Sequence, residues 1–96
     1  MPTYISFLRY TEQGIKNIKE SPSRLDAVRK AFQEAGAQLK EFYLLMGQYD
    51  ALCIAEAPDE ETVAKLMLNI GMKGNVRTET TRAFTESEFR KIAGSI

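Results

Sequence analysis

Residues 42–55, FYLLMGQYDALCIA, form two hydrophobic stretches with a turn between them. The first central position of a type II′ hairpin turn favours glycine, so Gly47-Gln48 predicts a two-residue turn that joins strands at 39–46 and 49–57. The five consecutive apolar residues at 42–46 predict that both faces of the first strand are covered. The chain therefore has an antiparallel hairpin at its centre.

The segments on either side of the hairpin repeat one pattern. Residues 4–10 alternate as a strand, and 11–20 form a polar connection with room for one or two helical turns. Ser21-Pro22 predicts a helix start with a capping hydroxyl, and Gly36 predicts its end. After the hairpin, Asp59 predicts the cap of a second helix, followed by a strand at 76–84 and a short helix at 86–92.

This β-α-β-β-α-β order predicts a single α+β domain over residues 1–96. The arrangement is ferredoxin-like, with an antiparallel sheet of strand order 4-1-3-2 and both long helices on one face. Two apolar sets cannot share a face of that sheet: Tyr4, Leu8, Tyr10, Ala51 and Cys53 on one side, and Ile5, Phe7, Leu52 and Ile54 on the other. We expect the set with Tyr4, Leu8 and Tyr10 to face outward, where a second copy of the chain would cover it in a homodimer.

Composition argues against several classes of protein. Thirteen basic and thirteen acidic side chains give a net charge of zero, so we expect no nucleic acid partner. The chain contains no histidine, which disfavours metal sites, and we expect no cofactor. The single cysteine, Cys53, is expected to be a small buried side chain in a reducing compartment. Without a signal sequence or a long apolar run, a cytoplasmic protein with no membrane contact is expected.

Several segments carry a resemblance to a known family. Gly47, Tyr49 and Asp50 match the three residues after which the GYD-domain family is named, and the resemblance extends to residues 11–14, 21–22, 56–59, 75–80 and 82–85. It implies a dimeric α/β barrel in which two ferredoxin-like sheets pack face to face. The family is functionally uncharacterised. The broader group of similar barrels includes cofactor-free monooxygenases, muconolactone isomerase-like proteins and the effector domains of Lrp-type regulators, and fold alone does not choose among them.

Five residues are candidates for a ligand site, and each has a structural alternative. Tyr49 and Asp50 could offer a phenol and a carboxylate at the mouth of a cavity, or could pack and hydrogen-bond within the turn. Arg82 could hold an anionic ligand or reach water at a strand end. Tyr4 and Ser6 could line a pocket together with Tyr10, although aromatic side chains on a sheet face more often form the core of an interface.

We expect these residues to bind a small, partly apolar metabolite in a cavity beside the sheet. Two alternatives stay open. One is a cofactor-free enzyme of the monooxygenase or isomerase type, with Asp50, glutamates and tyrosines as its acid-base groups. The other is a purely structural or protein-interaction role.

Overall fold

The predicted fold is present in a computed structural model that describes residues 1–96. Four strands form one antiparallel sheet of order β2-β3-β1-β4, which is the predicted order viewed from the opposite edge. The strands are β1 (Thr3–Tyr10), β2 (Gln38–Leu44), β3 (Ala51–Glu56) and β4 (Val76–Ala83). The helices are α1 (Glu12–Lys16), α2 (Ser21–Glu34), α3 (Glu60–Met72) and α4 (Glu86–Gly94), with a 3₁₀ turn at Ile18–Glu20.

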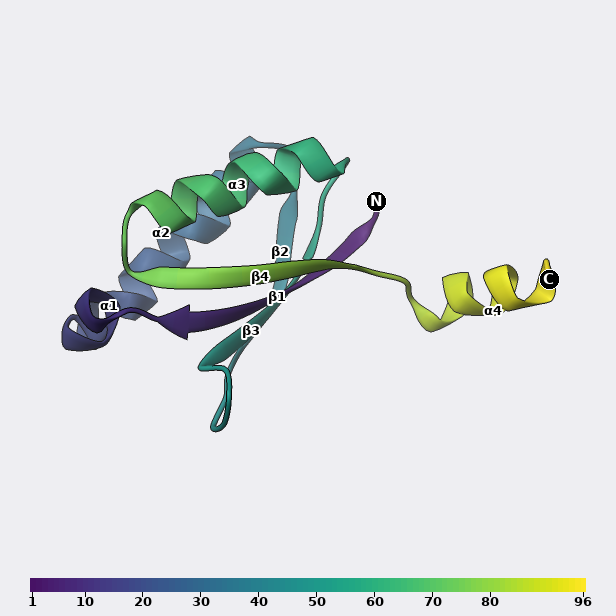
Figure 1. Ribbon diagram of the computed structural model, residues 1–96. Coiled ribbons are helices and arrows are strands. Elements are labelled where there is room, and N and C mark those ends of the chain that lie inside the picture. Colours follow the sequence, from purple (N-terminus) through teal and green to yellow (C-terminus); the bar gives the residue numbers. More distant parts are fainter.

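Helices α2 and α3 lie on the same face of the sheet, whereas α4 projects beyond its end (Figure 1). Phe32 of α2 is fully enclosed between the helices and the sheet, together with Val63 and Leu66 of α3. The core is therefore one layer between two helices and a sheet, and the opposite face of the sheet has no helix over it. None of the helices combines the length and the apolar character that crossing a membrane would require.

Two of the helix starts follow local sequence rules. The Asp59 carboxylate accepts a hydrogen bond from the Thr62 amide at 2.8 Å and caps α3, as predicted. Thr85 and Glu88 form a reciprocal capping box at the start of α4. The predicted Ser21 cap is wrong, because the 3₁₀ turn at 18–20 runs directly into α2 and Glu20 occupies the cap position. The Ser21 hydroxyl lies instead 3.2 Å from the Tyr10 hydroxyl.

The expected orientation of the sheet is also wrong. Tyr4 is only 3% exposed and belongs to the core beneath the helices, and Leu8 packs against the same core. The outward set is therefore Ile5, Phe7, Leu52 and Ile54. A physical reason lies in β3, whose alternate residues are Ala51, Cys53 and Ala55. These small side chains leave room for the helices to lie close to the sheet, while the larger alternate residues point away.

The central turn differs from the predicted one. Strand β2 ends at Leu44 and β3 begins at Ala51, and the Leu45 amide donates to the Asp50 carbonyl at 2.8 Å. Four residues therefore form the loop, and Gly47 does not have a positive φ, so the two-residue type II′ turn is wrong. The predicted covering of both faces of β2 is absent from the single chain, where Tyr43 is 52% and Leu44 69% exposed.

Candidate functional site

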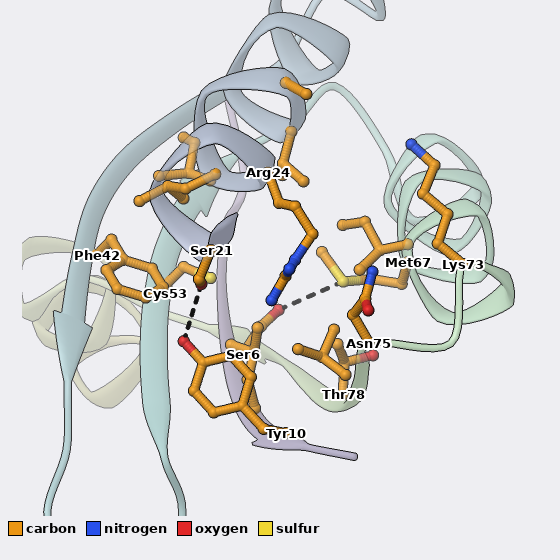
Figure 2. Close-up of a pocket in the computed structure, with 17 residues that line it drawn as sticks. Ser6, Tyr10, Ser21, Arg24, Phe42, Cys53, Met67, Lys73, Asn75 and Thr78 are labelled. Carbon is orange, nitrogen blue, oxygen red and sulfur yellow. Dashed lines mark hydrogen bonds between the residues drawn. The ribbon is translucent and has the colours of Figure 1, made fainter. Parts of the chain in front are cut away.

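A cavity of 140 Å³ lies between α2, α3 and the helix-facing side of the sheet. Figure 2 shows side chains from both helices and from the strands around it. Most of its wall is apolar because α2 and α3 each present their buried stripe to this space. The apolar lining includes Leu8, Leu25, Val28, Phe42, Met67 and Ile70. A space of this kind favours a compact hydrophobic group.

Polar groups occur at the floor and at the mouth of the cavity. Ser6, only 4% exposed, has its hydroxyl 2.7 Å from the Thr80 hydroxyl and 3.8 Å from the Met67 sulfur. The hydroxyls of Tyr10 and Ser21 lie 3.2 Å apart, a long hydrogen bond that either oxygen can donate. These hydroxyls are both donors and acceptors, so they can hydrogen-bond a polar ligand atom.

Arg24 is the charged side chain that reaches into the cavity from α2, whereas the ammonium of Lys73 points away (Figure 2). One guanidinium nitrogen of Arg24 donates to the Asn17 carbonyl at 3.0 Å, and another lies 3.5 Å from the Gly14 carbonyl. The side chain of Arg24 is 25% exposed, and the carboxylate of Glu20 is 4.0 Å away. The guanidinium is therefore positioned mainly by backbone carbonyls, and none of the cavity-lining residues is acidic.

Of the five residues predicted for a ligand site, Ser6 lines this cavity and Tyr4 lies on the same side of the sheet, within the core. The Tyr4 hydroxyl is buried and has no hydrogen-bond partner. Its burial raises the pKa of the phenol above the usual value, because desolvation disfavours the charged phenolate.

Tyr49 lies on the outward face of the sheet. Its ring centroid is 4.8 Å from that of Phe7, and the Arg9 guanidinium lies 4.5 Å from the ring centroid. The Tyr49 hydroxyl donates to a Glu79 carboxylate oxygen at 2.8 Å. This hydrogen bond raises the pKa of Tyr49 because it stabilises the protonated phenol beside a carboxylate.

Asp50 immediately precedes β3, and its backbone extends the pairing of β3 with β1. Its carboxylate accepts from the Tyr10 amide at 2.9 Å, and its own amide donates to the Leu8 carbonyl at 2.8 Å. Both bonds tie the loop to the end of β1. The contacts therefore match the structural alternative given for this residue, in which Asp50 bonds neighbouring amides.

Arg82 lies toward the end of β4, in the region where α4 leaves the sheet. Its guanidinium lies 4.4 Å from the Phe84 ring centroid and 5.9 Å from that of Tyr4, and it donates to the Ala83 carbonyl. Glu88 is its acidic neighbour, at 3.9 Å. The five predicted residues therefore occupy separate places and do not form one cluster.

Tyr10, named with Tyr4 and Ser6 as a residue that could line a pocket, does line the cavity, whereas sequence reasoning missed Arg24. A signal for Arg24 exists in the sequence, since it stands four residues before Val28 and so shares a helical face with the apolar stripe of α2. A charged residue on the buried face of a helix is unusual and indicates either a paired charge or a polar site.

Comparison with known proteins gives three results. The sequence profile of the GYD domain matches residues 4–93. A protein of Thermus thermophilus named "Glutamine synthetase and cystathionine beta-lyase binding protein" is 32% identical over 84 residues, which cover 86% of this chain and 88% of that protein. A crystal structure of a protein from the same organism is similar with a TM-score of 0.55 and 25% identity, over 88% of this chain and 95% of the other.

More distant similarity is found to regulatory proteins. The feast or famine regulatory protein of M. tuberculosis, solved with L-methionine, gives a TM-score of 0.67 at 14% identity. The match covers 88% of this chain but 51% of the regulator, so the chain spans about half the regulator's length. At this identity the similarity concerns the ferredoxin-like fold alone.

Proposed function

This chain belongs to the GYD domain family, and on that premise we propose that it is a small homo-oligomeric binding protein that associates with metabolic enzymes. The observation that carries this proposal is α4, which projects from the rest of the chain (Figure 1). This helix has an exposed apolar stripe. The stripe consists of Phe89, Ile92 and Ala93 on one face of the helix, and the exposed Ile96 follows just beyond the end of α4. The relative from Thermus thermophilus, named for binding glutamine synthetase and cystathionine beta-lyase, supports enzymes as the partners.

An isolated helix of nine residues is only marginally stable in water, so α4 gains stability when its stripe is covered. An amphipathic helix that inserts its apolar face into a groove is a common mode of protein recognition. Phe89 is the largest side chain of the stripe and therefore its expected anchor.

The test uses the organism's own glutamine synthetase and cystathionine beta-lyase, each immobilised and exposed to the purified protein in surface plasmon resonance. We expect Phe89→Ala to weaken binding by about tenfold or more, the typical effect of truncating an interface anchor. Lys91→Ala is the matched control, since it alters the same helix outside the apolar stripe and should leave the affinity nearly unchanged. Equal binding by both variants, or no binding of the wild type to either enzyme, would refute this role for α4.

The homo-oligomer of this proposal is a dimer joined through the outward face of the sheet, as in a dimeric α/β barrel. Ile5 pairs with Ile54 and Phe7 with Leu52 across β1 and β3, so four apolar side chains form one block on this face. No helix of the same chain lies over that block (Figure 1). A second copy of the same surface would bury it in a symmetric contact.

A pair of identical substitutions tests the dimer. Leu52→Glu places an unpaired charge in the expected interface, whereas Leu68→Glu makes the same change at a leucine of α3 that is 73% exposed. In analytical ultracentrifugation we expect the first substitution to raise the dimer dissociation constant about a hundredfold or more and the second to leave it unchanged. A wild-type protein that sediments as a monomer at micromolar concentration contradicts the interface.

The cavity favours a second candidate function, the binding of a small and partly apolar molecule between α2, α3 and the sheet. Its apolar wall and its hydroxyl groups are the features of a pocket that accepts a mostly hydrophobic ligand with one polar end. Native mass spectrometry of the protein purified from its source would detect such a ligand. Val28→Phe fills part of the cavity, and we expect it to reduce the bound fraction, whereas an unliganded wild-type protein would speak against this candidate.

A further inference from the structure

We infer that the cavity accepts a small hydrophobic monocarboxylate, with its carboxylate at the Arg24 guanidinium and its hydrocarbon part between α2 and α3. This inference rests on the second candidate function, that the cavity holds a small molecule, and it specifies the chemical class of that molecule. Size and charge support it independently.

The size of the cavity limits the hydrocarbon part. Its volume is 140 Å³, and an apolar cavity of about 150 Å³ is known to hold a benzene ring. Leu8, Leu25, Val28 and Met67 surround this space with carbon and sulfur atoms. The ligand therefore has one aromatic ring or a short branched chain, and longer chains would have to extend into solvent.

The charge of the cavity selects the polar end. A guanidinium has five N–H donors, and Arg24 directs donors to two backbone carbonyls, those of Asn17 and Gly14. The neighbouring carboxylate of Glu20 is 74% exposed and 4.0 Å away, so water screens much of its effect. A ligand carboxylate inside the cavity would meet a positive charge with no acidic lining residue nearby.

The number of cations distinguishes a carboxylate from a phosphate. Arg24 is the single cationic group that points inward, because the Lys73 ammonium points away from the cavity (Figure 2). Phosphate sites usually supply several donors from a glycine-rich loop or a cluster of cations. The single positive charge of one guanidinium balances the single negative charge of a monocarboxylate. The hydroxyls of Tyr10 and Ser21 at the mouth can donate further hydrogen bonds to it.

Three probes of similar size and different charge test this inference: benzoate, benzyl alcohol and benzylamine. In NMR titrations of the wild-type protein we expect benzoate to bind about tenfold or more tightly than benzyl alcohol, and benzylamine to bind most weakly. Added salt should reduce the preference for benzoate, because the interaction with Arg24 is partly exposed. This measurement needs no variant and so does not depend on how a substitution affects folding.

Substitution of the cation then assigns the preference to one residue. We expect Arg24→Gln to weaken benzoate binding by about tenfold to a hundredfold and to change benzyl alcohol binding by less than about threefold. Retained binding of benzyl alcohol shows that the variant is folded. Arg29→Gln is the matched control, because Arg29 is on the same helix, does not line the cavity and lies 3.8 Å from Asp26.

These titrations distinguish failure of the carboxylate assignment from failure of the second candidate function. If benzoate and benzyl alcohol bind equally well to the wild type, or if Arg24→Gln keeps the preference for benzoate, the cavity binds small molecules but the carboxylate assignment is overturned. If none of the three probes shifts the resonances of cavity residues, both the assignment and the second candidate function are overturned.

Discussion

A single methyl group at Gly14 should destabilise the whole domain. Gly14 is buried in α1, where the helix lies against the residue that precedes β4. A Cβ at this position would overlap the carbonyl oxygen of Asn75 and lie 3.2 Å from the Asn75 Cα. The obstructing atoms belong to the backbone, so they cannot move aside as the end of a flexible side chain can. Gly14→Ala therefore has to push α1 away from β4.

The cost follows from what holds these two segments together. The Thr11 amide donates to the Asn75 carbonyl at 3.0 Å, and the Thr11 hydroxyl donates to the Gly74 carbonyl at 2.6 Å. Overpacking costs about 1–3 kcal/mol, and weakening two hydrogen bonds adds about 1 kcal/mol each. The higher helix propensity of alanine offsets about 0.5–1 kcal/mol of this destabilisation. We expect the free energy of unfolding to fall by about 2–4 kcal/mol, a large part of the roughly 5–15 kcal/mol typical of a small domain.

Urea denaturation followed by far-ultraviolet circular dichroism measures this loss as a lower transition midpoint at a similar slope. Gly71→Ala is the matched control, because Gly71 lies in α3 with no atom within 4 Å of the added Cβ. Its alanine variant should be more stable than the wild type by about 0.5–1 kcal/mol. A Gly14→Ala protein within about 1 kcal/mol of the wild type would show that the contact of α1 with Asn75 is not close.

Three further outcomes are expected. Gly47→Ala should change the free energy of unfolding by less than about 0.5 kcal/mol, because Gly47 has no positive φ and its added Cβ meets no atom within 4 Å. A loss of more than about 1 kcal/mol in thermal melts would show that the turn is strained. Burial raises the pKa of Cys53 from 9.0 to about 11, so the unfolded thiol ionises first and stability should fall as the pH rises through this range. Cys53→Ala should lack that part of the fall in urea titrations at pH values from about 8 to 11, and identical pH profiles would contradict the burial of the thiol. Asp59→Ala should cost about 1 kcal/mol through loss of the cap on α3. Hydrogen bonds from Thr62 hold the pKa of Asp59 below its usual value, so the difference between variant and wild type should shrink as the pH falls through that lowered pKa; a constant difference would show that the charged cap contributes nothing.

The sequence alone was sufficient for the number and order of the strands, the two long helices and the family. Hydrophobic periodicity, the cap at Asp59 and the positive-φ glycine at Gly36 are local properties, readable from a few neighbouring residues. The ferredoxin-like arrangement follows from the order of those elements, since two β-α-β units joined by a hairpin have few compact arrangements.

The tertiary structure alone decided which face of the sheet meets the helices. Both sets of alternate residues in β1 contain large apolar side chains, so a two-residue period cannot distinguish the inner set with Tyr4 from the outer set with Phe7. The choice depends on packing, in which the small residues of β3 make room for Phe32. Local sequence also could not show that Gly47 lies in a four-residue loop, because the register of β2 with β3 sets the loop length.

The sequence predicted a cavity beside the sheet and named Ser6 among its lining residues, but it did not indicate which of the other candidates would lie near it. Tyr49 and Asp50 are neighbours in the chain, yet the Tyr49 side chain lies on the outer face while the Asp50 carboxylate binds the backbone of β1. Arg24 belongs to the site because α2 and α3 pack on the sheet and leave between them a cavity that its side chain lines. A binding site is formed by side chains from distant segments that share one space, and that space exists only after the elements have packed.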